Sequence, residues 1–471
     1  MSHPYGVQPE GNRFLNSGCD DCRDRGLGTL ARLPDSFLID HLLEDSYLGP
    51  VCLCRLSRVS RVFYVYCHVE SIWRWQYMRT FPASFQAILE EATLTSTLCW
   101  KSLVTRVPHV ALRMRGVYSD YLFHPWLCAT CGVADHLEGR TVTPHPIPKA
   151  AMDPATFLRE YESKGRPCVL QGVIQANWQH LLEKFETFSQ VGETLGQNRR
   201  VQCEAMCVTW PEYYAYLNHR ELHSERPLYL FDPEALRDLN LSLPYFPHDF
   251  FSVLGKDTRP QYRWLVVGPE RSGSSFHIDP NATNAWNALF SGKKWWLMLP
   301  PGVTPPGVKP SADGGDVTTS PSLMEWVMNW YPAALRTGHC YETVCEAGEI
   351  MYIPSGWWHM VINLTDCIAL TQNYVGPSNV AKVLRFLRHK KRAITGCGGM
   401  DDDELDGQDV IARRGELFDV FSTKLIKAFP GKYEELVEQV KGSVSCELDG
   451  SIAPVQKKRK GLRASEPFTL F

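Results

Sequence analysis

The chain has 471 residues, of which 44% are hydrophobic and 21% are charged. At about 150 residues per domain this length predicts roughly three folded units, and the composition excludes a chain that is disordered or collagen-like throughout. The formal net charge of -3 at pH 7 does not require a polyanionic partner, so any binding of nucleic acid would depend on a local patch.

The hydropathy pattern excludes secretion and membrane insertion. The first 14 residues contain no continuous apolar stretch like that of a secretory signal, and no window reaches the ~18 consecutive apolar residues that span a bilayer. We therefore expect a protein without a membrane span that resides in the nucleus, the cytoplasm or both. In a reducing compartment the 16 cysteines are expected to remain thiols.

Residues 28–80, which follow a flexible polar lead-in of residues 1–27, have the periodicity of three short amphipathic helices. The second predicted helix carries an apolar stripe across residues 51–63. The region resembles an F-box, and the positions that carry this resemblance are Leu33, Pro34, Val59, Ser60 and Trp73. The resemblance implies that the adaptor subunit of a ubiquitin ligase is a partner. The alternative is a helical bundle that only caps the next domain.

The rest of the chain divides by pattern into four segments. Residues 81–150 form a connecting segment, and residues 151–378 contain short apolar runs punctuated by Gly and Pro, which is typical of β architecture. Helical periodicity returns in residues 379–450. Residues 451–471 are a basic tail, in which the run at 457–460 is either a nuclear-import signal or a disordered basic end.

Two Cys-x-x-Cys pairs, Cys19/Cys22 and Cys128/Cys131, invite a zinc interpretation. Zinc sites usually bring two such pairs much closer together in sequence. We therefore expect buried or idle thiols rather than structural zinc.

His277 and Asp279 lie two residues apart, after a strand-like run at 263–267. Alternate side chains of a strand point to the same face. We therefore expect His277 and Asp279 to face one metal ion, and Ile278 to pack into the opposite layer. Such a pair is common by chance, so the interpretation requires a third ligand.

His359 supplies the third ligand, on a predicted strand that follows a turn at Pro354 and Gly356. Two imidazoles and one carboxylate occupy one triangular face of an octahedral ion and leave three positions open, as in non-heme Fe(II) oxygenases. A 2-oxo acid would fill two of these positions and O2 the third. A structural zinc site is closed by four protein ligands and offers no such vacancy.

Lys294 lies on a predicted strand at 293–299, where it alternates with Trp296 and Met298. A charge on this apolar face is costly unless it meets an anion. We therefore expect Lys294 to bind the far carboxylate of the 2-oxo acid, and Thr371 to donate a hydrogen bond to the same group. The alternative is that Lys293 and Lys294 form an exposed turn pair.

The region from 167 to 376 resembles a jumonji C (JmjC) 2-oxoglutarate dioxygenase. Within that group it is most similar to the phosphatidylserine-receptor type of arginine demethylase and lysyl hydroxylase. The motifs that carry the resemblance are Pro227-Leu228-Tyr229-Leu230-Phe231, Tyr262-Arg263-Trp264, Arg271-Ser272-Gly273, His277-Ile278-Asp279-Pro280, Ala285-Trp286-Asn287-Ala288-Leu289 and Thr371-Gln372-Asn373.

The resemblance implies an α+β fold class: a double-stranded β-helix of the cupin or jelly-roll type, preceded by the F-box-like bundle and followed by C-terminal helices. It implies that Fe(II) is bound by His277, Asp279 and His359. It also implies that 2-oxoglutarate, the co-substrate with O2, is surrounded by Ser274, Asn287, Lys294 and Thr371.

Two positions depart from the family pattern. Ser274 stands where the family more often has Thr, although the hydroxyl is retained. The tyrosine that the family contributes to co-substrate binding has no clear counterpart among Glu204, Ala205 and Met206.

Two classes of function follow from these features. In the first, the chain hydroxylates, or by hydroxylation demethylates, lysine or arginine side chains of a protein substrate. In the second, it is an interaction protein whose F-box-like region recruits a ubiquitin ligase and whose barrel only binds targets. The three predicted ligands and Lys294 favour the enzyme, because a binding module needs no open iron site. We expect the choice of substrate to lie in loops such as 305–322.

Overall fold

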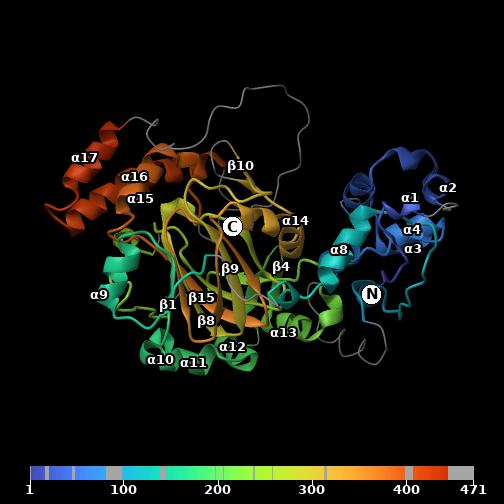
Figure 1. Cartoon of the computed structure of the whole chain (residues 1–471), viewed down its shortest axis with the longest axis horizontal. Helices are drawn as coiled ribbons and strands as arrows, with labels where there is room; N and C mark the ends of the chain where they lie inside the picture. The colour runs from blue at the N-terminus through green and yellow to red at the C-terminus, as the bar shows by residue number, and fades with distance from the viewer. Residues whose placement is uncertain are drawn as a thin grey trace. The chain divides into compact units, whose positions relative to one another are not determined.

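The computed structural model describes residues 2–15, 21–44, 48–80, 98–137, 145–196, 198–204, 206–236, 239–256, 258–311, 316–397 and 407–443. The chain divides into two compact units (Figure 1). The first unit comprises residues 1–137, 195–228 and 322–325, and the second comprises residues 138–194, 229–321 and 326–471. The acidic run at 401–406, the basic tail at 451–471 and Cys19 lie outside the described residues.

The first unit is built mainly from short helices. In chain order these are α1 (Asn12–Leu15), α2 (Arg23–Leu27), η1 (Gly28–Arg32), η2 (Phe37–Glu44), α3 (Pro50–Leu56), α4 (Arg61–Tyr66), α5 (Glu70–Thr80), α7 (Trp100–Thr105), α8 (Asp120–Thr130), η3 (Ala134–His136), α13 (Trp210–Asn218) and η5 (Arg220–Leu222). A hairpin of β3 (Arg200–Cys203) and β4 (Met206–Thr209) accompanies them. Ile72 and Trp73 of α5 are fully buried, as their spacing predicted.

The predicted second helix of this unit is wrong in one respect. Residues 51–63 belong to two helices, α3 and α4, because Ser60 caps α4 by accepting a hydrogen bond from the backbone N–H of Phe63. Val51 and Val59, which were placed on the apolar stripe, are 64% and 67% exposed. The F-box interpretation stays a prediction.

The second unit contains two β-sheets. One has the strand order β1 (Lys149–Ala150), β2 (Cys168–Leu170), β13 (Ile350–Ile353), β8 (Asn284–Ser291), β15 (Cys367–Tyr374), β6 (Arg263–Gly268) and β5 (Leu230–Asp232). The other has the order β12 (Tyr341–Glu346), β9 (Lys293–Leu299), β14 (Trp358–Asn363) and β7 (Gly273–His277). Adjacent strands pair antiparallel except β1 with β2.

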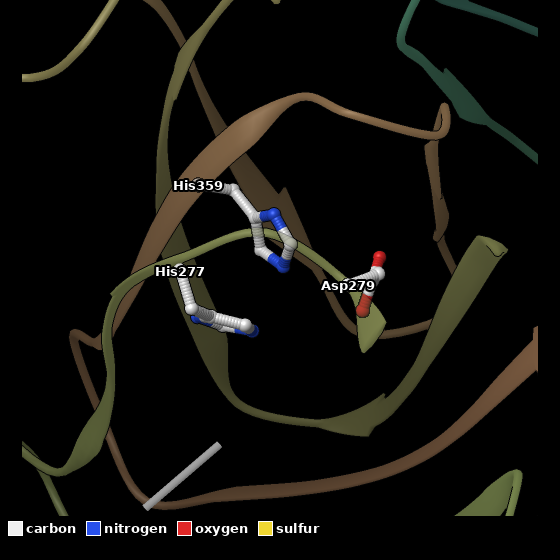
Figure 2. A group of neighbouring side chains, drawn as sticks. All are labelled: His277, Asp279 and His359. Carbon is white, nitrogen blue, oxygen red and sulfur yellow. The ribbon is translucent and has the colours of Figure 1, made fainter. Parts of the chain in front are cut away.

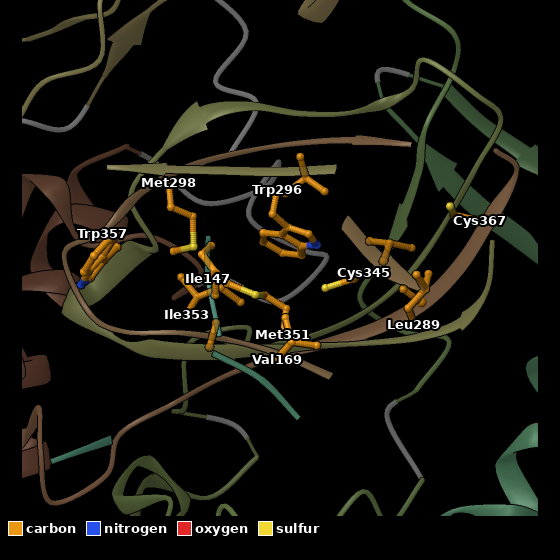
Figure 3. Close-up of a cluster of buried hydrophobic side chains, with 14 of the residues drawn as sticks. Ile147, Val169, Leu289, Trp296, Met298, Cys345, Met351, Ile353, Trp357 and Cys367 are labelled. Atoms are coloured by element: carbon orange, nitrogen blue, oxygen red, sulfur yellow. The ribbon is translucent and has the colours of Figure 1, made fainter. Parts of the chain in front are cut away.

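A single core forms between the two sheets, as Figure 3 shows. Trp296 and Met298 come from the four-stranded sheet, and Leu289 and Met351 come from the other sheet. Strand alternation places these side chains on the inner faces. This arrangement is the predicted cupin-type double-stranded β-helix within an α+β chain.

Helices cover the remainder of the second unit. They include α9 (Pro154–Phe157), η4 (Leu158–Glu162), α10 (Val173–Asn177), α11 (Gln179–Phe185), η6 (Phe250–Leu254), η7 (Pro280–Ala282), α15 (Val380–His389), η8 (Lys391–Ala393), α16 (Gly407–Ala428) and α17 (Glu434–Gly442). The C-terminal helices, predicted from periodicity, share a core that includes Leu384, Phe418 and Val437. None of the described helices is both long enough and apolar enough to cross a bilayer.

Candidate functional site

Two histidines face each other across neighbouring strands of the four-stranded sheet. His277 ends β7 and lies directly opposite His359 on β14. The centroids of their rings are 4.1 Å apart. Figure 2 shows both rings and the Asp279 carboxylate converging on one space. Pairing within a sheet fixes both backbones, so the relative position of the two imidazoles does not depend on a loop.

Backbone carbonyls orient both rings. The Nδ1 atom of His277 lies 2.7 Å from the carbonyl oxygen of Ser275, and the Nδ1 atom of His359 lies 3.1 Å from that of Trp357. A carbonyl only accepts hydrogen bonds, so each Nδ1 carries the proton and donates it. The lone pair of each ring is then on Nε2, which is the tautomer that a metal ion requires.

Asp279 does not lie on the strand that the sequence predicted for it. Strand β7 ends at His277, and Asp279 is the residue before the short helix η7. Ile278 is 38% exposed rather than packed in the opposite layer. The two ligands therefore converge because the chain turns after His277, and strand alternation does not explain their arrangement.

One oxygen of the Asp279 carboxylate has no hydrogen-bond partner. Its Oδ1 atom accepts a bond of 3.4 Å from Asn373 Nδ2, whereas Oδ2 is buried and unpaired among the described residues. A buried, unpaired carboxylate oxygen is costly unless a cation binds it. The ligand atoms of His277, Asp279 and His359 all lie within 4.8 Å of one another, so the three residues fit a metal ion.

This group is the only candidate metal cluster in the part of the chain that the structure describes. Cys128 is buried on α8 and Cys131 follows that helix, and neither belongs to a metal-binding group there. The expectation that these cysteines do not form a zinc site stays a prediction.

Burial favours the neutral form of the two histidines and opposes the ionisation of Asp279. Burial, and next the neighbouring His359, lower the pKa of His277 to about 4. Burial also lowers the pKa of His359 to about 4. Both imidazoles are therefore neutral at pH 7, the form that binds a metal. Burial raises the pKa of Asp279 to about 6, opposed by His277 and by the hydrogen bond from Asn373.

One cavity brings together all seven residues singled out in the sequence. It encloses about 620 Å³ of space, part of it open to solvent. The predicted residues that line it are Ser274, His277, Asp279, Asn287, Lys294, His359 and Thr371. Residues up to 97 positions apart in the chain thus share one site, although their individual roles remain predictions.

Lys294 lies inside this cavity and is 1% exposed, so the alternative of an exposed turn pair is wrong for it. Only Lys293 is exposed, and it forms an ion pair of 2.8 Å with Glu346. Lys294 Nζ lies 2.9 Å from the hydroxyl of Tyr229, and none of the described carboxylates forms an ion pair with it. The cavity therefore holds a buried cation that an anionic ligand would neutralise.

Sequence reasoning missed two residues of the site. Tyr229 lines the cavity beside Lys294, whereas the co-substrate-binding tyrosine of the family was expected near positions 204–206. Asn373 lines the cavity and contacts Asp279. Both residues stood within motifs that carry the JmjC resemblance, and that was the signal available for finding them.

The hydrogen-bonding groups of Thr371 and Trp296, which also line the cavity, are only partly satisfied. Thr371 lines the cavity and donates its hydroxyl proton to the carbonyl oxygen of Trp286, 2.9 Å away, so its predicted bond to the co-substrate would replace this one and stays a prediction. The indole Nε1–H of Trp296 is buried and has no acceptor among the described residues. The Trp296 ring stacks on His359 with a centroid distance of 6.1 Å. The Trp296 indole N–H is therefore a buried, unused donor in this cavity.

Comparison with known proteins agrees with this site. Residues 264–374 match the family model described as "JmjC domain, hydroxylase". The chain is 34% identical over 469 residues to the arginine-specific demethylase JMJ22 of Arabidopsis thaliana, an alignment that covers 95% of this chain and 86% of the relative. The chain belongs to the JmjC family.

Two further relatives have matches that cover less of each chain. The bifunctional arginine demethylase and lysyl-hydroxylase psr-1 of Caenorhabditis briggsae is 32% identical over 252 residues, which cover 48% of this chain and 59% of psr-1. The 2-oxoglutarate and iron-dependent oxygenase JMJD4 of Gallus gallus is 29% identical over 269 residues, which cover 50% of this chain and 61% of JMJD4. These matches confirm the resemblance on which the sequence interpretation rested.

Proposed function

We propose that this JmjC protein is an Fe(II)- and 2-oxoglutarate-dependent dioxygenase that hydroxylates, or by hydroxylation demethylates, lysine or arginine side chains of a protein substrate. One observation carries the proposal: a single cavity contains both the His277–Asp279–His359 group and the buried Lys294. The first of these sites suits a cation with open coordination positions, and the second suits a carboxylate. A 2-oxo dicarboxylate has the chemistry to connect them.

Separate residues of the chain would bind the metal, bind the co-substrate and position the metal ligand. His277, Asp279 and His359 would hold Fe(II), which with O2 and 2-oxoglutarate supplies the oxidation of a C–H bond together with release of succinate and CO2. Lys294 and Tyr229 would bind the far carboxylate of 2-oxoglutarate. Asn373 holds the Asp279 carboxylate in place, and the apolar walls around Trp296 exclude water.

The names of relatives support the substrate class. JMJ22 is named an arginine-specific demethylase, and psr-1 is named both an arginine demethylase and a lysyl hydroxylase. Removal of an N-methyl group and hydroxylation of a side-chain carbon both begin with oxidation of a C–H bond, so one site serves both outcomes. The comparisons give no support to the adaptor of a ubiquitin ligase as a partner.

The experiment is an assay for succinate combined with mass spectrometry of peptides. Purified protein, Fe(II), 2-oxoglutarate and a peptide pool rich in lysine and methylarginine are expected to yield succinate, with peptide masses that gain one oxygen or lose a methylene unit. His277→Ala and Asp279→Ala are expected to abolish both signals while retaining the far-UV circular dichroism of the wild type. Equal turnover in the wild type and both variants would refute the assignment.

A further inference from the structure

A run of cations follows the last strand of the barrel. Residues 382–392 contain no Asp or Glu, in a chain whose net charge is -3. The cations of this basic segment are Lys382, Arg385, Arg388, Lys390, Lys391 and Arg392. The mechanism proposed above uses none of them.

The segment presents its charges to solvent. Helix α15 buries Val383 and Leu387 in the C-terminal core, whereas Lys382 and Arg385 are exposed. Lys391 and Arg392 in η8 are also exposed. Among the described residues none of the six cations forms an ion pair, and only Arg388 has an aromatic partner, with its guanidinium carbon 5.5 Å from the centre of the Phe418 ring. The positive charge is therefore available to an external anion.

Both ends of the basic segment are tied to the helix that follows the metal ligand. Before the segment, Asn379 Nδ2 donates a bond of 3.0 Å to the carbonyl oxygen of Ala282 in η7. After the segment, Asn281 of η7 forms two hydrogen bonds with the backbone of Thr395, of 3.0 and 3.2 Å. Helix η7 begins at Pro280, which lines the cavity directly after Asp279.

This attachment limits the distance between the cations and the site of oxidation. Asn281 lies two Cα steps after Asp279, and Thr395 lies three Cα steps after Arg392. At 3.8 Å per Cα step, with about 6 Å for the hydrogen-bonded side chain, Arg392 lies at most roughly 25 Å from Asp279 along this path. An extended peptide covers that distance in about seven residues. Residues that flank a modified side chain are therefore within reach.

We propose that the basic segment binds acidic residues that flank the lysine or arginine being modified. This inference rests on the proposed function, because it assumes that the cavity oxidises a protein side chain. A lysine or arginine that is flanked by acidic residues would bind more tightly, because the basic segment attracts the acidic residues while the target side chain enters the cavity. Nucleic acid would meet the same cations, but the activities named for the relatives concern arginine and lysine.

The test compares two labelled peptides on the full chain loaded with Fe(II) and 2-oxoglutarate without oxygen. One peptide has a central lysine and four Glu within seven residues of it, and the other has Gln in place of each Glu. Fluorescence anisotropy at low salt is expected to show at least tenfold tighter binding of the Glu peptide. The preference is expected to shrink at 500 mM salt, as screening requires. The variant Lys391→Glu/Arg392→Glu is expected to lose most of the preference for the Glu peptide over the Gln peptide.

The controls separate the inference from the proposed function. Lys427→Glu/Lys432→Glu changes two exposed lysines, one in the last turn of α16 and one in the turn between α16 and α17, and is expected to keep the preference for Glu. Release of succinate without peptide is expected to be the same in both charge variants and the wild type. Absence of that release in the wild type would contradict the proposed dioxygenase, whatever the peptides do.

Two results would overturn the inference itself. The first is equal binding of the Glu and Gln peptides by the wild type. The second is tighter binding of a single-stranded oligonucleotide than of the Glu peptide, lost in Lys391→Glu/Arg392→Glu, which would assign the basic segment to nucleic acid.

Discussion

Lys294 Nζ lies 2.9 Å from the hydroxyl oxygen of Tyr229, and both side chains line the cavity that contains the three metal-binding residues. An ammonium group only donates hydrogen bonds, so the Tyr229 oxygen accepts and its proton remains available to another acceptor. Together the two side chains present a positive charge and a hydroxyl donor at one place. This pairing is what a terminal carboxylate of 2-oxoglutarate requires.

Tyr229→Phe removes that donor while retaining the ring. We expect the KM for 2-oxoglutarate to rise about tenfold, which corresponds to the loss of one hydrogen bond of ~1.4 kcal/mol. Iron affinity is expected to be unchanged. Tyr245→Phe is the matched control, because the Tyr245 hydroxyl donates to the carbonyl oxygen of Met152 instead. An unchanged KM in Tyr229→Phe would remove Tyr229 from the co-substrate site.

Trp296→Phe tests whether the unpaired indole N–H of Trp296 donates a hydrogen bond to 2-oxoglutarate. If Trp296 Nε1–H donates to the bound co-substrate, the substitution is expected to raise the KM for 2-oxoglutarate about three- to tenfold and leave iron binding intact. Trp330, which is 40% exposed, serves as the control through Trp330→Phe. A KM that stays at the wild-type value would assign Trp296 to packing alone.

The effect of Asp279→Asn on the stability of the metal-free protein is expected to depend on pH. The folded state raises the pKa of Asp279 from 3.8 to about 6, because burial disfavours the charged form. Folded protein therefore holds this proton to higher pH than the unfolded chain, and this contribution to stability is lost as the pH rises from about 4 through 6. With chelator present, Asp279→Asn is expected to melt at a higher temperature than the wild type at pH 8.

The difference is expected to shrink toward pH 4, where the wild-type carboxyl is protonated. His277 and His359 titrate in both proteins, so their opposite contributions largely cancel in the comparison. Thermal unfolding of both proteins at pH 4, 6 and 8 measures the difference in melting temperature. A lower melting temperature of Asp279→Asn at pH 8 would mean that the carboxylate stabilises the empty site.

Gly273→Ala tests how the sheet positions the histidines. Gly273 starts β7 with a φ of +149°, and a Cβ there would lie 2.0 Å from the carbonyl oxygen of Val361 on β14. We expect the substitution to lower the free energy of unfolding by at least about 2 kcal/mol and to weaken iron binding, because these two strands carry His277 and His359. Gly415→Ala in α16, where an added Cβ meets nothing outside its own helix within 4 Å, is expected to leave iron binding unchanged and not to lower the free energy of unfolding, because alanine favours a helix by about 1 kcal/mol over glycine. Wild-type stability of Gly273→Ala would contradict the close approach.

Much of the site followed from the sequence because motif spacing records which residues share a strand face. His359 and Lys294 were placed correctly, since strand periodicity turns their side chains inward. Asp279 was expected on a strand and lies after one, because β7 ends at His277, two residues earlier than the alternation of polar and apolar residues suggested. Local pattern gives the type of an element more reliably than its last residue.

Contacts across the fold could not be predicted in this way. Asn373 contacts Asp279 although 94 residues separate them, and Tyr229 contacts Lys294 across 65 residues. The partners of these side chains depend on which strands lie next to each other. Val51 and Val59 were given a buried face because their spacing was read as one helix, and the cap at Ser60 divides that helix in two.

The most direct test of the iron and 2-oxoglutarate site is an anaerobic titration followed by absorption spectroscopy. Addition of 2-oxoglutarate to the Fe(II)-loaded wild type is expected to produce the visible charge-transfer band of a chelated 2-oxo acid. Lys294→Ala is expected to need much more 2-oxoglutarate for the same band, and His277→Ala to show none. A wild type without the band, or a His277→Ala variant that retains it, would contradict the account.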